Sequence, residues 1–337
     1  MYQRDRDQLS FYDQVYQATV PKNHLLRKLD RVIDWGAFEP IFEGLYSDRG
    51  RQAYNPILMF KALVLQFLYD LSDRKLEEQL IGFMPFRWFL NLDPMGQPPD
   101  HTAYCRFRER LGPDKTAELF GEVVKQARKL RLVKDRLSIV DATAIAAKVD
   151  TYRMQSHKHK DDDDDGPPSR VDPDATYGHK TKKKPFFGYK AAVSYDADSG
   201  LVTKLTTTTG REHDSTHFWE VSDPKASGVL ADKGYDSFLN FAFLAIRGQR
   251  AGIIPRAVRG KKRGHIKNRY HQTSDYLWFW RNKNKRPLVE RFFAETKQWH
   301  GLGRARYWGL AKTKVQVAMT ALAYNLKRMV KLCLQPV

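Results

Sequence analysis

Cysteine is scarce in this chain, since Cys105 and Cys333 are the only two among 337 residues. Two thiols cannot build a disulfide framework or a four-cysteine zinc site, and we expect both to be reduced in a cytosolic protein. Long hydrophobic runs are also missing, because no apolar stretch reaches the ~18 residues that a membrane span needs. The first ten residues, MYQRDRDQLS, are charged and polar, which is not typical of a secretory signal peptide.

Acidic residues are too few to balance the basic ones. The chain has 39 Asp and Glu against 58 Lys and Arg, which gives a net charge of +19. The excess is concentrated in residues 251–310, where 15 basic residues stand against 3 acidic ones. This balance favours a polyanionic partner such as nucleic acid. It does not favour a membrane, because no basic amphipathic helix stands out. A merely basic surface without such a partner is the alternative.

Helical patterns dominate residues 1–130. Asn55, Ser72 and Asp100 are residues of the type that begins helices, and Gly112 is of the type that ends one. We expect these helices over 55–71, 72–83, 98–112 and 114–130.

The helical part of the chain also predicts a way to read DNA. Residues 72–112 resemble a helix-turn-helix, and their last helix carries Arg106 and Arg108, which could face a major groove. A helical bundle with a charged outer face is the alternative. We therefore predict an all-α DNA-binding domain over 1–130, with the helix-turn-helix-like part within 55–130.

Strand patterns begin near residue 131. A polar, Asp-rich stretch near 152–184 reads as a mobile loop, because consecutive aspartates repel one another. The patterns predict strands over 137–145, 228–231 and 251–258, a hairpin over 185–210, short helices over 213–223 and 237–250, and a helix that begins near Arg286.

Three acidic residues stand next to apolar segments of this second part. Asp141 and Asp232 each end an apolar strand, and Glu290 lies beside the apolar face of the last predicted helix. Each has an ordinary explanation, as a turn cap or as a salt-bridged helix residue. A buried carboxylate is costly without a cation or donors, however, and three together would suit hard divalent cations. Two such ions could activate a water or a 3′-hydroxyl and stabilise a leaving oxygen.

Several motifs together resemble one protein family, the DDE transposases of bacterial insertion sequences. They are IVDAT, DPDATYG, FFGYKAAVSYDADSGLV, REHDS, LADKGYDS and RPLVERFFAETKQWHGLGRARYWGL. The resemblance covers about residues 55–337 in order. It implies an α/β fold in which a ribonuclease-H-like catalytic domain over 131–337, with a mixed central sheet, follows the all-α domain over 1–130.

The resemblance also implies roles for single residues. Asp141, Asp232 and Glu290 would be the catalytic, metal-binding triad for two Mg²⁺ ions per site, with Mn²⁺ able to substitute. Arg286 and Lys297 would contact DNA phosphates, whereas Lys283 stands where relatives often carry a tyrosine. The further DNA-contact candidates are basic residues near these motifs or on the predicted recognition helix: Arg106, Arg108, Lys261, Lys262, Arg263, Arg304 and Arg306.

Some supporting residues are open to two interpretations. Four tryptophans could stack on bases or pack in the core, namely Trp278, Trp280, Trp299 and Trp308. His213 and Asp214 are interpreted as supporting residues, with Asp214 as the cap of the short helix that follows.

The sequence thus predicts a transposase that acts at the bacterial nucleoid, in the cytoplasm. It would bind the double-stranded terminal inverted repeats of an element as a homodimer, cut the ends by metal-dependent hydrolysis and join the 3′-hydroxyl ends to target DNA. The alternatives are a metal-dependent nuclease or resolvase on the same fold, and a domesticated protein that only binds DNA.

Overall fold

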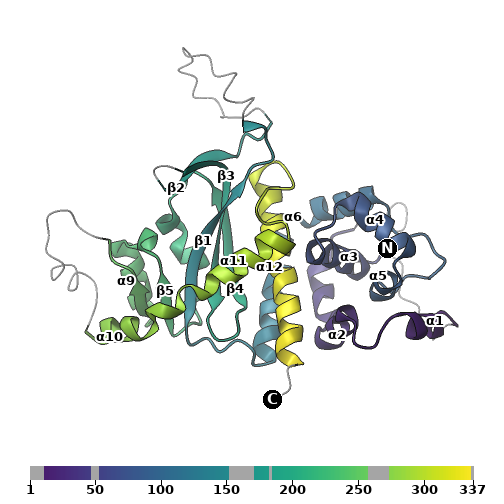
Figure 1. The fold of residues 1–337 in the computed structure, drawn as a ribbon, viewed down its shortest axis with the longest axis horizontal. Coiled ribbons are helices and arrows are strands. Elements are labelled where there is room, and N and C mark those ends of the chain that lie inside the picture. The colour runs from purple at the N-terminus through teal and green to yellow at the C-terminus, as the bar shows by residue number, and fades with distance from the viewer. Residues whose placement is uncertain (1–10, 47–52, 152–170, 182–183, 257–272, 335–337) are drawn as a thin grey trace, which may run out of the picture. The chain divides into compact units, whose positions relative to one another are not determined.

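The structure, a computed structural model, describes residues 11–46, 53–151, 171–181, 184–256 and 273–334 (Figure 1). The chain forms two compact units. The first holds Met1–Leu130, Trp299–Gly301 and Ala318–Val337, and the second holds Arg131–Gln298 and Leu302–Val317. The sequence placed 131–337 in one domain. The long helix α12 (Leu310–Cys333) is divided between the two units after Val317, and the predicted domain bounds stay a prediction. None of the described helices is long and apolar enough to cross a membrane.

The first unit is helical. Side chains begin its main helices where the sequence predicted them: Asn55 Oδ1 accepts from Ile57 N (2.8 Å) and Asp100 Oδ1 accepts from Ala103 N (2.7 Å). Gly112 has φ +57° and ψ −173°, which are not helical values, so that α6 consists of two helical segments that meet at this residue, where the sequence predicted a helix end. The described helices before Leu130 are α1 (Phe11–Thr19), α2 (Leu25–Val32), η1 (Gly36–Phe42), α3 (Pro56–Leu68), α4 (Asp73–Gly82), α5 (Met84–Phe89) and α6 (His101–Lys129).

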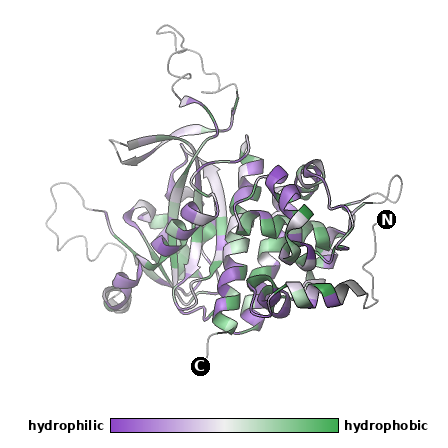
Figure 2. Ribbon diagram, turned by 45° about the vertical axis from the view of Figure 1, so that its right-hand side comes forward, coloured by the Kyte–Doolittle hydropathy of each residue, from purple (hydrophilic) through white to green (hydrophobic). Residues whose placement is uncertain are grey.

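Aromatic rings form much of the core of the helical unit. The Trp35 ring lies 5.9 Å from that of Phe60 and 5.5 Å from that of Phe89, both edge-on, and Phe38 lies 4.9 Å from Phe60. Edge-on and tilted pairs are the favoured arrangements of aromatic rings. Figure 2 shows hydrophobic and hydrophilic residues alternating along these helices. The helix-turn-helix predicted within residues 72–112 stays a prediction. The short helix α5 lies within that stretch.

The second unit is built on a six-stranded mixed sheet in the order β2-β3-β1-β5-β6, with β4 also paired to β3. The long strand β3 is antiparallel to β1, β2 and β4, whereas β5 is parallel to both β1 and β6. The mixed sheet agrees with the predicted architecture. The strands are β1 (Ser138–Ala146), β2 (Thr176–Thr181), β3 (Lys184–Asp196), β4 (Val202–Thr209), β5 (Gly228–Ala231) and β6 (Arg250–Ile253).

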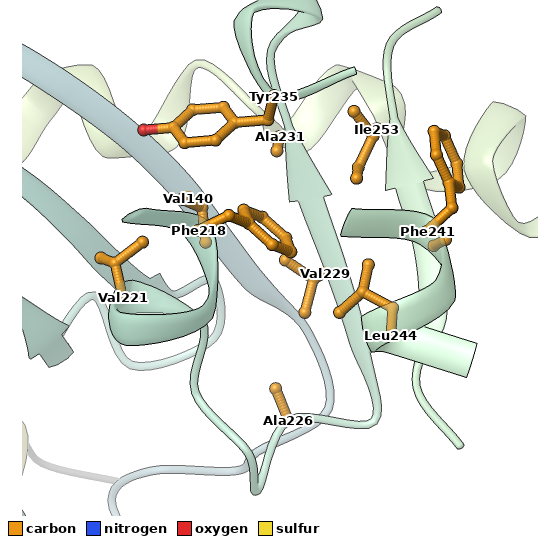
Figure 3. Packing of buried hydrophobic residues seen from close by; sticks show 11 residues of the cluster. Val140, Phe218, Val221, Ala226, Val229, Ala231, Tyr235, Phe241, Leu244 and Ile253 are labelled. Atoms are coloured by element: carbon orange, nitrogen blue, oxygen red, sulfur yellow. The ribbon is translucent and has the colours of Figure 1, made fainter. Parts of the chain in front are cut away.

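Helices pack against this sheet. A buried cluster joins Val140 of β1 and Val229 of β5 to Phe218, Phe241 and Leu244 of the neighbouring helices (Figure 3). Burial of side chains of this size stabilises the fold by roughly 1.5–3 kcal/mol each. The described helices of this unit, besides α12, are η2 (Asp214–His217), α8 (Phe218–Val221), η3 (Lys233–Tyr235), α9 (Phe238–Ile246), α10 (Thr273–Asn282), η5 (Lys283–Lys285) and α11 (Leu288–Trp299).

One part of the predicted mobile loop is wrong. Residues 176–181 of the stretch 152–184 form β2, which pairs with the first part of β3. The Asp172 side chain is fully buried, and its Oδ1 accepts from the Tyr189 hydroxyl (2.5 Å) and from Gly309 N (3.1 Å). The Asp-rich run itself, within 152–170, lies outside the described residues.

Candidate active site

The register of the sheet places the first two predicted acids at the same level. The parallel pairing of β1 with β5 covers Ser138–Val140 and ends at the pair Val140↔Ala231. Asp141 and Asp232 directly follow the two residues of this last pair. Asp141 does not end its strand, as the sequence analysis expected, because β1 continues to Ala146 through its pairing with β3. It therefore cannot cap a turn there, and this alternative for Asp141 is removed.

The two carboxylates are oriented in the same way. Asp141 Oδ1 accepts from the backbone N–H of Ala142 (2.9 Å), and Asp232 Oδ1 accepts from that of Lys233 (2.7 Å). Each Oδ2 faces the guanidinium of Arg286, whose Nη2 lies 3.5 Å from Asp141 Oδ2 and 3.6 Å from Asp232 Oδ2. The chain thus brings two carboxylate oxygens to one positive group.

The third predicted acid, Glu290, is not close enough to the two aspartates to form a group of three with them. Glu290 lies in the first turn of α11 and is exposed, one turn after Arg286. The predicted inner face of this helix is confirmed, since Val289, Phe292, Phe293 and Thr296 are buried. Among the residues that the structure describes, no group of three or more His, Cys, Asp and Glu side chains is close enough to hold a metal ion. A shared metal would require Glu290 to approach the two aspartates.

The charge around Asp141 is unbalanced. Burial raises the pKa of its carboxyl, and the nearby charges of Asp232 and Glu290 raise it further, whereas Arg286 and the N–H of Ala142 lower it. The balance is a pKa above the ordinary value of an aspartate. A desolvated group of negative charges is stabilised by a cation, and carboxylate oxygens are the ligands that hard divalent ions prefer. The donor set therefore fits Mg²⁺ or Mn²⁺ in its chemistry.

The motif REHDS acts differently from the expectation. His213, not Asp214, is the N-cap of η2, because its Nδ1 accepts from Ser215 N. Asp214 Oδ1 instead pairs with Lys190 Nζ at 3.0 Å. Lys190 was not among the residues predicted from the sequence, and its side chain is only 16% exposed. A lysine inside a strand pattern gives no sign of its partner before the strands are paired.

The loop after Asp232 is fixed from outside. Arg256 donates from Nε to Lys233 O (2.8 Å) and from Nη2 to Gly234 O (3.0 Å), and its own backbone N–H bonds Asp236 Oδ2 (2.6 Å). These contacts hold the turn that carries Asp232. Arg256 could not be predicted from the sequence, because an arginine after a strand has no local signature.

Apart from Arg286, which faces Asp141 and Asp232, the predicted DNA contacts divide into three groups. Arg106, Lys297 and Arg304 are exposed and Arg306 is half-buried, so their side chains can reach a ligand in solvent. Lys261, Lys262 and Arg263 lie outside the described residues. Arg108 differs from its expectation, because its side chain is only 7% exposed and binds both carboxylate oxygens of Asp73, at 2.6 and 2.7 Å.

Trp278 of α10 packs against the sheet. A Cβ on Gly228 would lie 2.4 Å from its indole, and one on Gly252 would lie 2.9 Å from it. The ring therefore lies against the backbone of β5 and β6, which agrees with the packing alternative. Trp280, Trp299 and Trp308 remain exposed, by 46%, 60% and 54%.

Family models and a solved structure match this chain. A solved structure described as "piggyBac transposase synaptic complex with hairpin DNA" matches 92% of this chain and 80% of its own, at 11% identity and a TM-score of 0.37. The family model described as "Transposase domain (DUF772)" matches residues 14–110. The model described as "Transposase DDE domain", a domain of the ribonuclease-H-like fold, matches residues 133–326, which is more than half of the chain. The chain therefore belongs to the DDE transposase family.

Proposed function

We propose that this transposase binds the double-stranded terminal inverted repeats of a bacterial element, cuts the element ends by metal-dependent hydrolysis and joins the 3′-hydroxyl ends to target DNA. The observation that carries this proposal is that the β1–β5 register brings the carboxylates of Asp141 and Asp232 to the same guanidinium, that of Arg286. The protein would act at the nucleoid as a homodimer, because two ends must be held together for joining. Membership of the family supports the reaction class.

Asp141, Asp232 and Glu290 would hold two Mg²⁺ ions, with Glu290 as a ligand of one of them. The ions would activate the attacking hydroxyl and stabilise the leaving oxygen. The backbone N–H groups of Ala142 and Lys233 hold each Oδ1, so that each carboxylate keeps its orientation. Preorganised oxygens lower the cost of placing charge during the reaction.

Basic side chains outside this carboxylate group would position the DNA. Arg286 lies two positions before α11, at the end of η5, and Lys297 lies in the last turn of α11. Together with Arg304 and Arg306, they would bind phosphates of the element end, and Arg106 would contact DNA from the helical unit. Phosphate contacts of this kind set the register of DNA without reading its sequence.

The test is cleavage and strand transfer on a labelled duplex that carries the terminal repeat flanking the gene. Wild type is compared with Asp141→Asn, Asp232→Asn and Glu290→Gln, which keep side-chain size. Asp198→Asn is the matched control, because this exposed aspartate pairs only with Arg136 among the contacts that the structure describes. We expect cutting and joining to fall at least 100-fold in the three variants, with DNA binding retained.

Other outcomes would separate the alternatives. Cutting without joining would indicate a nuclease, and binding without cutting in Mg²⁺ or Mn²⁺ would indicate a DNA-binding protein. If one of the three variants keeps normal activity, that acid is structural. Light scattering of the protein with the duplex measures the number of chains in the complex.

A further inference from the structure

Arg286 occupies the position between the two aspartates that a metal ion would need. Its Nη2 lies 3.5 and 3.6 Å from the Oδ2 atoms of Asp141 and Asp232. These are the two oxygens that no backbone N–H holds in the described hydrogen bonds. A guanidinium and a divalent cation therefore compete for the same pair of atoms.

The contacts that hold the Arg286 side chain there are long, namely one hydrogen bond of 3.5 Å to Asp141 and an ion-pair contact of 3.6 Å to Asp232. Hydrogen bonds to a carboxylate are normally 2.7–2.9 Å long when the donor is charged, and both contacts are much longer. Within the described part of the chain, no atom accepts from Arg286 Nε, although that atom is buried. The guanidinium could form stronger bonds to a better-placed acceptor, such as a phosphate, which it can bind with two parallel N–H groups.

The backbone around Arg286 is fixed, so that the side chain alone can change partners. Arg286 N–H donates to Lys283 O (3.2 Å) at the end of η5, and Arg286 O accepts from Val289 N (3.4 Å) in the first turn of α11. The side chain is 23% exposed, which gives it a path to solvent. A change of rotamer is a fast motion that requires no unfolding.

We propose that Arg286 is a built-in counter-ion, which pairs with Asp141 and Asp232 in the DNA-free protein and leaves them for a DNA phosphate. The inference rests on the proposed metal-dependent function. Since the guanidinium and the metal exclude each other, DNA that draws Arg286 away strengthens metal binding, and by linkage metal strengthens DNA binding to the same extent. The transposase would then bind its metal ions chiefly when it is already bound to DNA.

The experiment measures Mn²⁺ affinity of the full chain by titration calorimetry, without and with the terminal-repeat duplex. Arg286→Gln removes the charge and keeps hydrogen-bonding atoms, and Arg286→Lys keeps the charge. Arg291→Gln is the matched control, since Arg291 is an exposed arginine five positions further along. Asp141→Asn tests the site itself. Thermal unfolding of each variant checks that it is folded.

We expect Arg286→Gln to bind Mn²⁺ about tenfold more tightly than wild type in the absence of DNA, within the ~5–150-fold range of measured site-to-site coupling. DNA should raise the Mn²⁺ affinity of wild type, of Arg286→Lys and of Arg291→Gln, but not that of Arg286→Gln. Unchanged or weaker Mn²⁺ binding by folded Arg286→Gln would overturn the inference.

The Asp141→Asn variant distinguishes a failure of the proposed metal site from a failure of the counter-ion role of Arg286. If Asp141→Asn binds Mn²⁺ as wild type does, the proposed metal site is wrong and the inference is lost with it. If Asp141→Asn abolishes Mn²⁺ binding while Arg286→Gln has no effect, the metal site stands and only the counter-ion role is wrong.

Discussion

Replacing Arg108 by alanine should destabilise the helical unit without directly weakening DNA binding. Its guanidinium binds both oxygens of Asp73, at 2.6 and 2.7 Å, and its Nη1 donates to Gln66 Oε1 at 3.0 Å. Removing one partner of a buried ion pair costs roughly 3–5 kcal/mol, because the other charge is left unpaired. The Asp73 side chain is 25% exposed, so that water can solvate it, and we expect a loss of about 2–3 kcal/mol.

The matched substitution is Arg106→Ala, two positions earlier on the same helix. Arg106 is exposed, and surface substitutions usually change stability by less than ~0.5 kcal/mol. If it contacts a phosphate, its loss should weaken binding to all DNA sequences and reduce the salt dependence by about one released ion. Arg108→Ala should therefore lower stability more than Arg106→Ala does, and Arg106→Ala should lower DNA affinity more than Arg108→Ala does.

Thermal unfolding followed by circular dichroism, and DNA binding followed by fluorescence anisotropy, measure these effects. For a unit of this size, 2–3 kcal/mol corresponds to a decrease in Tm of roughly 5–12 °C. The double variant with Asp73→Ala should be less unstable than the sum of the two single variants. An Arg108→Ala protein that melts as wild type does and has lost DNA affinity would refute the structural role.

Two further predictions concern the second unit. Gly228→Ala should destabilise it by about 1–3 kcal/mol and change tryptophan fluorescence, because the new Cβ would lie 2.4 Å from the Trp278 ring; Gly303→Ala, where a Cβ meets nothing within 4 Å in the described structure, should have neither effect. Burial lowers the pKa of His217, but hydrogen bonds and charges of two glutamates outweigh it and raise this pKa above 6.5. Its stabilising contribution is therefore full below pH 6.5 and is lost as the pH rises through the raised pKa. Wild type should lose more Tm over this range than His217→Gln, and equal curves would contradict the charge pairing.

Local patterns predicted the elements that local rules determine. The caps at Asn55, Ser72 and Asp100 were found from residue type alone, because one side-chain oxygen and one backbone N–H decide them. The hairpin of β3 and β4 was found from alternating apolar residues that flank a turn. The inner face of α11 followed from its helical period.

Other elements depend on distant partners. The α10 sequence TSDYLWFWRN has consecutive aromatic residues without a helical period, and its Trp278 is explained by glycines of β5 and β6. Strand β2 was hidden in a polar stretch, because its partner residues in β3 lie beyond it in the chain. Arg108 resembled the exposed arginines beside it until Asp73, 35 positions earlier, was brought to it. The predicted triad and DNA contacts stay predictions, since they concern ligands as well as the chain.

The position of Asp141 follows from the unequal lengths of two strands. β1 has nine residues and is paired along its whole length with β3, whereas the parallel strand β5 has four and pairs with β1 only as far as Val140. A strand that continues after its neighbour has ended leaves one edge open, and a carboxylate there meets a turn instead of a ladder. Asp232 lies in that turn. A slip of one residue in the β1–β5 register would turn the Asp141 side chain to the other face of the sheet, away from Asp232 and Arg286. The proposed site is therefore determined by strand pairing as much as by the acids themselves.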